Sequence, residues 1–490
     1  MYKKSDNSPQ MGNLPYFLDG TLNPNNRWVK LAGTIPWIAV EELYSSNFKS
    51  KLGPRALPAR VAFGSLIIQI KLGLTDEETV EALSENPYLQ FFIGLEQYIH
   101  QAPFDASLMT HFRQRFNAND IKNIDELLYK ICNTEKEEEK NSDDDPPANR
   151  GSLIVDATCV PSDIKYPTDI ELLNKAREKT EKVIDLLWKH RINKDDKQKP
   201  RTNRQKARKR FMSVILKKKV SRKKRRECIG YQLNCIERNL QSIEKLKVYC
   251  SLSVLGEKLY KDLLVVGTLY SQQKHMYENK INSVEDRIVS IHQPHVRPIV
   301  RGKAGAHTEF GAKVSVSVVN GWTFTDTISF DAYNEGTELI SQIQKYHQRF
   351  GYYPESVHAD KIYRNATNRR FCKENKIRLS GPQLGRPTKD LHLRKQQKQI
   401  QKMDEAVRNT VEGKFGVGKR RYEMDRILTK LKSSSELVIA LLFMVMNVDR
   451  AIAFREFFIV LKRQLQAIYC YCLQSHSNTD LEYNLKMAPH

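Results

Sequence analysis

One short apolar run, Leu153 to Val160, constrains the fold of this chain more than any other segment. The run is rich in β-branched side chains and too short for a typical buried helix, so it predicts a buried strand. A single carboxylate, Asp156, lies in its middle. Because a buried, unpaired charge is costly, Asp156 is a candidate metal ligand. The alternative is a strand-end aspartate that is hydrogen-bonded to a turn.

The strand pattern returns after Pro294. Residues 310–330 alternate apolar and polar side chains, and Asn320-Gly321 in their middle predicts a two-residue hairpin turn. A helix is expected over about 334–349. A short strand follows, Ser356-Val-His-Ala-Asp360, and it ends in a second carboxylate.

Two further helices are expected near the C-terminal end. The first is basic, over residues 402–416, and carries Glu412. The second is apolar, over 437–461. Its most apolar stretch runs only from Leu437 to Met446 before Asn447 interrupts it. That is about half of a bilayer span, so it predicts a buried helix.

The order of these elements is strand with Asp156, hairpin, helix, strand with Asp360, and helix with Glu412. It is the order of a ribonuclease-H-like mixed sheet with flanking helices, within a multidomain chain of the α+β or α/β class. In such a sheet the first and fourth strands are neighbours, so the three carboxylates can converge. Carboxylate oxygens suit Mg²⁺, and two ions about 3.5–4 Å apart assist in-line phosphoryl transfer. Competing aspartates in loops or strand flanks are Asp163, Asp169, Asp326 and Asp331.

Residues 1–133 predict a separate N-terminal helical domain, which would serve in DNA binding or dimerisation. Thr75-Asp-Glu-Glu78 has the spacing of a capping box and starts one of its helices. Short helices joined by turns fit either a helix-turn-helix reader, in which Arg113 and Arg115 face phosphates, or a plain helical bundle. Residues 134–150 are an acidic linker with two prolines, which cannot bury a core.

The expected catalytic domain, residues 151–170 and 294–462, is interrupted by an insertion, residues 171–293. Apolar residues between Ile229 and Ile243 recur at steps of four and three, which predicts a coiled-coil-like antiparallel helical hairpin. Between its arms, residues 197–226 hold nine lysines, seven arginines and no acid, out of a net charge of +23. Such a stretch favours binding to a phosphate backbone over the alternative of a solvated helix.

Taken together, these motifs resemble the bacterial insertion-sequence DDE transposases of the "four/five" superfamily. The likeness covers most of residues 40–460, and the combination is more specific than any one motif. The resembling segments are Leu153–Thr158, His358–Asn365 and Arg378–Pro387, Arg408–Tyr422, Arg297–Lys303 with Glu309–Lys313, and Phe104–Leu108 with Arg113–Phe116.

The resemblance implies roles for individual residues. Asp156, Asp360 and Glu412 would be the catalytic residues and the ligands of two Mg²⁺ ions per active site, with Mn²⁺ as a substitute. Arg408 and Lys419 fit the family's signature around the glutamate, whereas Glu405 stands where the family has tyrosine. The expected DNA-binding residues are Arg408, Lys414, Lys419, Arg420, Lys217, Lys218, Lys219, Arg222, Lys223, Lys224, Arg225, Arg226, Arg113 and Arg115.

The function that the resemblance implies is that of a metal-dependent DNA transposase. Two protomers, as a homodimer, would bind the terminal inverted repeats of an insertion element, cleave at its ends and join the 3′-hydroxyls to target DNA. The partner is double-stranded DNA, with no membrane and no small-molecule substrate.

We expect a cytoplasmic, nucleoid-associated protein, because the cysteines are sparse and no secretory signal is visible. Residues 463–490 form a C-terminal tail. Two other functions remain open: a structure-specific metal-dependent DNA nuclease, and a catalytically inactive DNA-binding regulator derived from a transposase.

Overall fold

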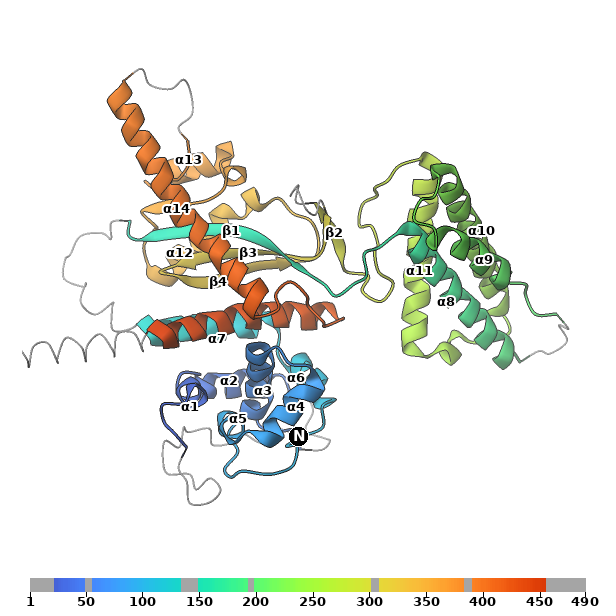
Figure 1. The fold of residues 1–490 in the computed structure, drawn as a ribbon, viewed down its shortest axis with the longest axis horizontal. Helices are drawn as coiled ribbons and strands as arrows, with labels where there is room; N and C mark the ends of the chain where they lie inside the picture. Colours follow the sequence, from blue (N-terminus) through green and yellow to red (C-terminus); the bar gives the residue numbers. More distant parts are fainter. Residues whose placement is uncertain are drawn as a thin grey trace, which may run out of the picture.

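The computed structural model combines a helical N-terminal part, a central mixed sheet and a helical insertion (Figure 1). The expected acidic linker lies outside the described residues except for its last two positions, and the expected C-terminal tail lies outside them entirely. The structure describes residues 22–48, 55–133, 149–192, 198–300, 308–382 and 390–454.

Seven helices make up the N-terminal part as far as the structure describes it. The predicted capping box is confirmed: Glu78 N donates to Thr75 Oγ1 at 3.2 Å, and Thr75 N donates to Glu78 Oε2 at 2.8 Å. The helices are α1 (Arg27–Ala32), α2 (Trp37–Ser46), α3 (Ala59–Leu72), α4 (Asp76–Glu85), α5 (Pro87–Phe92), α6 (Leu108–Arg115) and α7 (Ala118–Asn133).

The last of these helices, α7, joins the N-terminal part to the sheet. Its Asp125 is buried and accepts hydrogen bonds from Trp322 Nε1 at 3.1 Å and from Asn447 Nδ2 at 3.1 Å. Its Tyr129 ring lies edge-on against Phe324. As a result, one continuous apolar core runs from the N-terminal helices into the sheet.

The sheet has six strands, in the order β2-β3-β1-β5-β6, with β4 paired to β3. β1 runs antiparallel to β3 and parallel to β5, and β6 is parallel to β5. The strands are β1 (Ser152–Pro161), β2 (Arg297–Val300), β3 (Thr308–Val319), β4 (Trp322–Ser329), β5 (Ser356–His358) and β6 (Arg378–Leu379).

The hairpin between β3 and β4 turns where the sequence predicts it. Asn320 and Gly321 have φ angles of 50° and 77°, the pair of positive values that a type I′ turn requires. β1 is also confirmed as a strand that is mostly buried, with Asp156 opposite Val316 of β3.

Several helices and short 3-10 turns pack around the sheet. They are α12 (Leu339–Phe350), α13 (Ala366–Glu374), α14 (Leu391–Arg421) and the helix Lys432–Phe454, with short 3-10 turns η4 (Glu335–Thr337) and η5 (Lys361–Tyr363). α14 is longer than expected and continues through Gly416 and Gly418. A Cβ atom on Gly418 would lie 3.0 Å from Met424, so this glycine permits close packing at that point.

The helix Lys432–Phe454 is long and apolar enough to cross a membrane by length and composition. In the fold, however, Leu437, Phe443 and Val448 are buried in the main core. Asn447 donates to Asp125 across that core. We therefore describe it as a core helix, as the sequence predicts.

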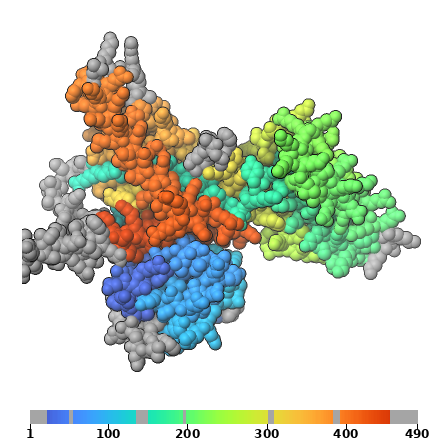
Figure 2. All heavy atoms as spheres, in the orientation of Figure 1, coloured from blue at the N-terminus to red at the C-terminus, as the bar shows by residue number. Residues whose placement is uncertain are grey.

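The insertion is a bundle of four long helices, not the expected two-helix hairpin, and a coiled-coil seam is not confirmed. The hairpin prediction missed α11, whose Leu259, Val266 and Leu269 are buried against the other helices. Figure 2 shows the bundle as a separate lobe. Its elements are α8 (Asp169–His190), α9 (Arg204–Ile215), α10 (Arg222–Leu246), η3 (Leu252–Leu255) and α11 (Gly256–Asn279).

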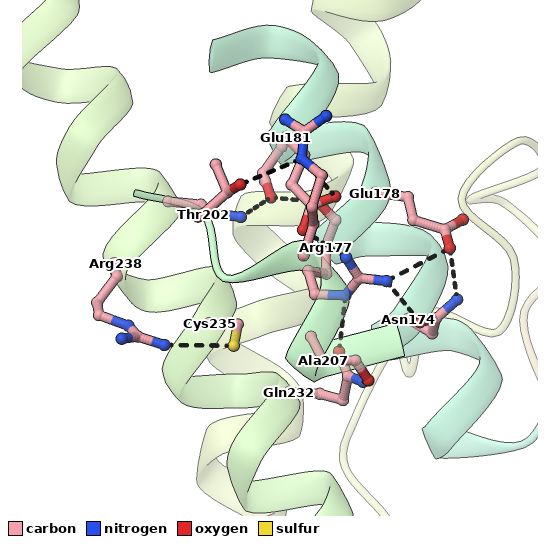
Figure 3. A network of polar contacts seen from close by, with 12 residues as sticks. Asn174, Arg177, Glu178, Glu181, Thr202, Ala207, Gln232, Cys235 and Arg238 are labelled. Atoms are coloured by element: carbon pink, nitrogen blue, oxygen red, sulfur yellow. Dashed lines mark hydrogen bonds and ion pairs between the residues drawn. The ribbon is translucent and has the colours of Figure 1, made fainter. Parts of the chain in front are cut away.

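A buried polar network lies inside this bundle (Figure 3). Arg177 of α8 is 1% exposed; its guanidinium donates to Gln232 Oε1 at 3.1 Å and to Asn174 Oδ1 at 2.8 Å, and forms an ion pair with Glu181. Such a network breaks the apolar repeat that a coiled coil needs, which is a physical reason why the insertion packs differently from the prediction.

Candidate active site

Asp156 projects from the middle of β1 and is half-buried. The pKa of its carboxyl is raised to about 6, chiefly by burial and to a smaller extent by the Glu335 and Asp360 carboxylates. The Ala157 N–H, which donates to Asp156 Oδ1 at 2.8 Å, and the Arg408 guanidinium oppose this rise in pKa. A carboxylate with this environment is destabilised in its charged form until a cation balances it.

Asp360 lies two residues beyond the end of β5, the neighbour of β1, so the strand expected over 356–360 ends earlier, at His358. β1 and β5 are parallel and pair Ile154 with His358, and each aspartate follows its paired residue by two positions. Asp360 is exposed and begins η5, where its Oδ1 accepts a hydrogen bond from Lys361 N at 2.7 Å. The parallel pairing leaves the two predicted aspartates near each other, and the Asp360 carboxylate is one of the groups that raise the pKa of Asp156.

Glu412 comes from α14, which crosses the sheet and packs against β1 and β5 (Figure 1). Its neighbours Val411 and Phe415 are buried in the core, whereas the Glu412 side chain is 58% exposed. Arg408 Nη1 lies 3.4 Å from Glu412 Oε1. Since Arg408 also acts on the pKa of Asp156, it links the glutamate electrostatically to the aspartates.

α14 is fixed to the sheet at two points. Near its middle, the buried Asp404 carboxylate accepts two hydrogen bonds from the Arg378 guanidinium, at 2.8 and 2.9 Å. Further on, Lys414 Nζ donates to the Gly321 carbonyl at 2.5 Å. The segment that carries Arg408 and Glu412 lies between these two anchors.

The described residues contain no group of three or more His, Cys, Asp or Glu side chains arranged to hold a metal ion. Asp156 and Asp360 nonetheless offer the oxygen donors that Mg²⁺ prefers, and a divalent cation would stabilise the charged form of Asp156, which burial and, to a smaller extent, nearby carboxylates disfavour. The donor chemistry fits a divalent cation, although the structure does not bring Glu412 into direct contact with the two aspartates.

The four competing aspartates are engaged elsewhere. Asp326 is buried on β4 and accepts from Gln342 Nε2 at 2.9 Å. Asp163 pairs with Arg426 at 3.0 Å, and Asp169 pairs with Arg287 at 2.6 Å. Asp331 lies 3.8 Å from Arg297.

The cations of the insertion form an exposed cluster. Some basic residues of the acid-free stretch find acids on α8: Arg204 pairs with Asp185 at 2.8 Å. The eight DNA-binding candidates of the insertion are all exposed, in the turn after α9 and in the first turns of α10. We call them the α10 cluster: Lys217, Lys218, Lys219, Arg222, Lys223, Lys224, Arg225 and Arg226.

Three other candidates are used inside the fold, so we leave them out of the DNA surface. Arg113 is buried and donates to Asp76 through both Nη atoms. Arg115 lies over the Phe48 ring at 4.2 Å, and Lys414 is the half-buried anchor of α14. Lys419 is half-buried and Arg420 exposed near the end of α14.

The sequence interpretation missed Glu335 and Tyr363, both of which act electrostatically near Asp156. The one signal for Glu335 was its place after Asn334, which caps η4 through a hydrogen bond to Gly336 N at 3.0 Å. Tyr363 closely follows Asp360, and only the fold shows that it is buried.

Two family models match parts of this chain. A transposase DDE domain matches residues 357–449, which include Asp360 and Glu412. A second transposase domain, DUF772, matches residues 17–115 in the N-terminal part. The two matches follow the order that the sequence resemblance expects.

A curated protein also matches part of the chain. The chain is 36% identical over 159 residues to a protein of Rhizobium meliloti named "Uncharacterized protein ORF8 in nfe locus", and this covers 32% of the chain and 73% of that relative. No solved structure matches the fold. The two transposase domain matches lead to one conclusion: the chain belongs to the insertion-sequence DDE transposases.

Proposed function

We propose that this protein binds the terminal inverted repeats of an insertion element, cleaves at its ends and joins the freed 3′-hydroxyls to target DNA. The observation that carries the proposal is the parallel pairing of β1 with β5, because Asp156 and Asp360 each follow the paired residues Ile154 and His358 by two positions. Membership of a transposase family makes DNA the expected substrate.

The strand order supports a ribonuclease-H-like catalytic domain. β4, β3, β1, β5 and β6 lie in that order, with antiparallel pairs up to β1 and parallel pairs beyond it. The helix α14 packs against both β1 and β5. Of the proposed acidic residues, Asp156 lies within β1, Asp360 follows the end of β5, and Glu412 lies on α14.

In the proposed reaction, side chains of the protein bind the metal ions and orient the DNA. Asp156 and Asp360 would hold Mg²⁺, with Glu412 joining them from α14; Mn²⁺ would substitute. Bound divalent ions would polarise the scissile phosphate and lower the pKa of the attacking water or 3′-hydroxyl. Arg408, which is partly buried between Glu412 and Asp156, is placed to contact a DNA phosphate beside the carboxylates.

The α10 cluster is the proposed second DNA contact. Eight exposed cations over ten residues create a strong local positive potential. A contact to the phosphate backbone of DNA does not depend on the base sequence, so the cluster would suit either the ends of the element or the target DNA.

A plasmid that carries the gene with its flanking DNA tests the reaction. We expect the wild-type protein with Mg²⁺ to cut at the ends, and Asp360→Ala to bind the same DNA without cutting it. Wild-type cleavage by Asp360→Ala would contradict the assignment of the carboxylates.

Pre-cut ends separate the proposed function from a DNA nuclease. A transposase joins such ends to a second plasmid, whereas a nuclease leaves them unjoined. Binding without either reaction would indicate a regulator. Because each element has two ends, we expect two protomers in the joined complex, measurable by light scattering.

A further inference from the structure

The N-terminal part of α14 projects beyond the sheet (Figure 1). Asp390 caps this end of the helix, where its Oδ1 accepts hydrogen bonds from His392 N at 2.8 Å and from Leu393 N at 3.3 Å. Toward the sheet, the first described side chain of α14 that is buried is Asp404. Between the two aspartates, all side chains are exposed except for two half-buried glutamines. We call residues 392–403 the α14 extension, and its side chains are open to a partner.

The α14 extension has four cations and no acid; the cations are Arg394, Lys395, Lys398 and Lys402. All four are exposed, and none of them forms an ion pair with a residue that the structure describes. Like charges four residues apart weaken a helix, and Lys398 has such a neighbour on either side. A polyanion that lies along the helix would remove this repulsion.

The four cations share one side of the helix, and the same side leads to Glu412. With about 3.6 residues per turn, they lie within an arc of about 100° around the helix axis. Arg394 and Glu412 are about five turns apart, so their side chains leave the helix in nearly the same direction. The exposed Glu405 also lies on this side, between the cations and Glu412. The cations therefore extend the side of α14 that carries the proposed catalytic glutamate.

The distances along α14 fit a DNA duplex that leads away from the active site. At a rise of about 1.5 Å per residue, Lys402 lies about 15 Å and Arg394 about 27 Å from Glu412 along the helix. Phosphates of one DNA strand recur about every 3.4 Å along the duplex axis. A duplex parallel to α14 would thus meet these cations about four to eight base pairs from the cleaved phosphate.

A protein partner on the α14 extension is the competing explanation. Leu393, Ile400 and Met403 are exposed apolar residues on another side of the helix. They continue the line of Val407 and Val411, which pack into the main core. A protein would contact this apolar side, whereas DNA would contact the cations. The alignment of the cations with Glu412 favours DNA.

We propose that the cations of the α14 extension bind the phosphate backbone of the duplex that leads away from the cleavage site. This inference rests on the proposed function, because that function places the cleaved phosphate beside Glu412. It adds a third DNA contact to the active site and the α10 cluster, and this contact lies on the same helix as the active site.

The salt dependence of DNA binding tests the proposal without a need for activity. The full-length protein is titrated with a fluorescent duplex that contains an element end and extends well beyond the cleavage site on both sides. In the test variant, Arg394, Lys395, Lys398 and Lys402 are all replaced by glutamine. We expect the slope of log K against log salt to fall by about 0.9 for each lost phosphate contact, and the affinity at 0.1 M salt to fall at least about tenfold.

A matched control removes the same amount of charge elsewhere. Lys182, Lys189, Lys245 and Lys258 are exposed cations of the insertion outside the α10 cluster, and their replacement by glutamine should leave the slope nearly unchanged. An equal fall in the control would overturn the inference, because the loss would then reflect net charge alone. The Tm of both variants should match that of the wild-type protein, since all the replaced side chains are exposed.

The remaining outcomes separate this inference from the proposed function. A wild-type slope in the test variant overturns the inference and leaves the proposed function intact; the α14 extension would then be a solvated helix or a site for a protein. Failure of the wild-type protein to bind the duplex overturns both.

Two shortened duplexes test the position of the contact. Each ends about three base pairs from the cleavage site, one on the element side and the other on the flanking side. We expect the affinity difference between the test variant and the wild-type protein to vanish on one of them, because its DNA no longer reaches Lys402. A difference that persists on both would overturn the assignment, since the cations would then contact DNA elsewhere.

Discussion

The insertion and the sheet domain differ in where their charged side chains lie and in what balances them. Inside the insertion, the buried Arg177 is neutralised by Glu181, and the unbalanced cations are exposed around the start of α10. In the core that the sheet shares with α7, Asp125 and Asp156 are buried or half-buried carboxylates whose described hydrogen bonds come from neutral N–H groups. The insertion thus offers positive charge to a partner at its surface, whereas the sheet keeps negative charge where a cation can balance it.

The largest effect should come from the carboxylate on β1. We expect Asp156→Asn to slow DNA cleavage by at least about 10⁴-fold, or about 5 kcal/mol of transition-state stabilisation, because the oxygen donor is lost. DNA affinity should change little. Cleavage and binding assays on the same DNA fragment measure the two quantities, and a parallel loss of affinity would mean that the substitution disturbs the fold.

Breaking the internal pair of the insertion should cost nearly as much, but in stability. Arg177→Met leaves Glu181 buried without its partner, so we expect about 3 to 5 kcal/mol of destabilisation. Thermal unfolding followed by circular dichroism measures it. As a control, Arg177→Met combined with Glu181→Leu removes both charges and should recover most of the loss. Equal stability of the single variant and the wild-type protein would show that the Arg177–Glu181 pair does not contribute to stability.

The surface charges of the insertion should affect DNA binding alone. Replacing the α10 cluster with glutamines should reduce the slope of log K against log salt by about 0.9 for each DNA phosphate that is no longer neutralised, and weaken binding about a hundredfold or more at 0.1 M salt. Thermal stability should change little because all eight side chains are exposed, although Arg226 also donates to the Tyr277 carbonyl at 2.6 Å. An unchanged slope would show that this surface does not touch DNA.

The smallest effect concerns Asp125. Burial raises the pKa of its carboxyl from 3.8 to about 7 in the folded state, so the protonated form stabilises the fold. That stability is fully present below about pH 4 and is lost as pH rises through about 7.

Asp125→Asn is neutral at every pH and should lack this loss. We expect the difference in stability between variant and wild type to grow in favour of Asn by roughly 1 to 2 kcal/mol from pH 5 to pH 8. Urea unfolding at both pH values measures it, and other titrating groups cancel in the comparison. A difference that stays constant with pH would mean that Asp125 titrates normally.

Local patterns predicted much of the sheet domain correctly. The run around Asp156, the Asn320-Gly321 turn and the capping box of α4 each depend on neighbouring residues, so the sequence indicates them directly. The pairing of β1 with β5 could be predicted because the order of elements determines which strands are adjacent, whereas a joint role for Asp156 and Asp360 stays a prediction.

Other features depend on interactions between distant segments and could not be predicted. The charge on Arg113 is neutralised by Asp76, which is remote in sequence. α11 hides its apolar face in a bundle whose partners come from three other helices. The influence of Glu335 on Asp156 arises only once η4 meets η5. In each case the side chain's partner is set by tertiary packing and not by spacing.

The strand register at Gly311 determines how independently the insertion can change. The chain leaves the sheet at Pro161 and returns at Arg297, and both residues pair with Gly311 from opposite sides. The two ends of the excursion are therefore about 10 Å apart, two strand spacings. A segment closed over so short a gap can grow, shrink or be exchanged without shifting the strands that carry the aspartates. The DNA binding proposed for the insertion and the catalysis proposed for the sheet can consequently evolve, or be engineered, as separate properties of one chain.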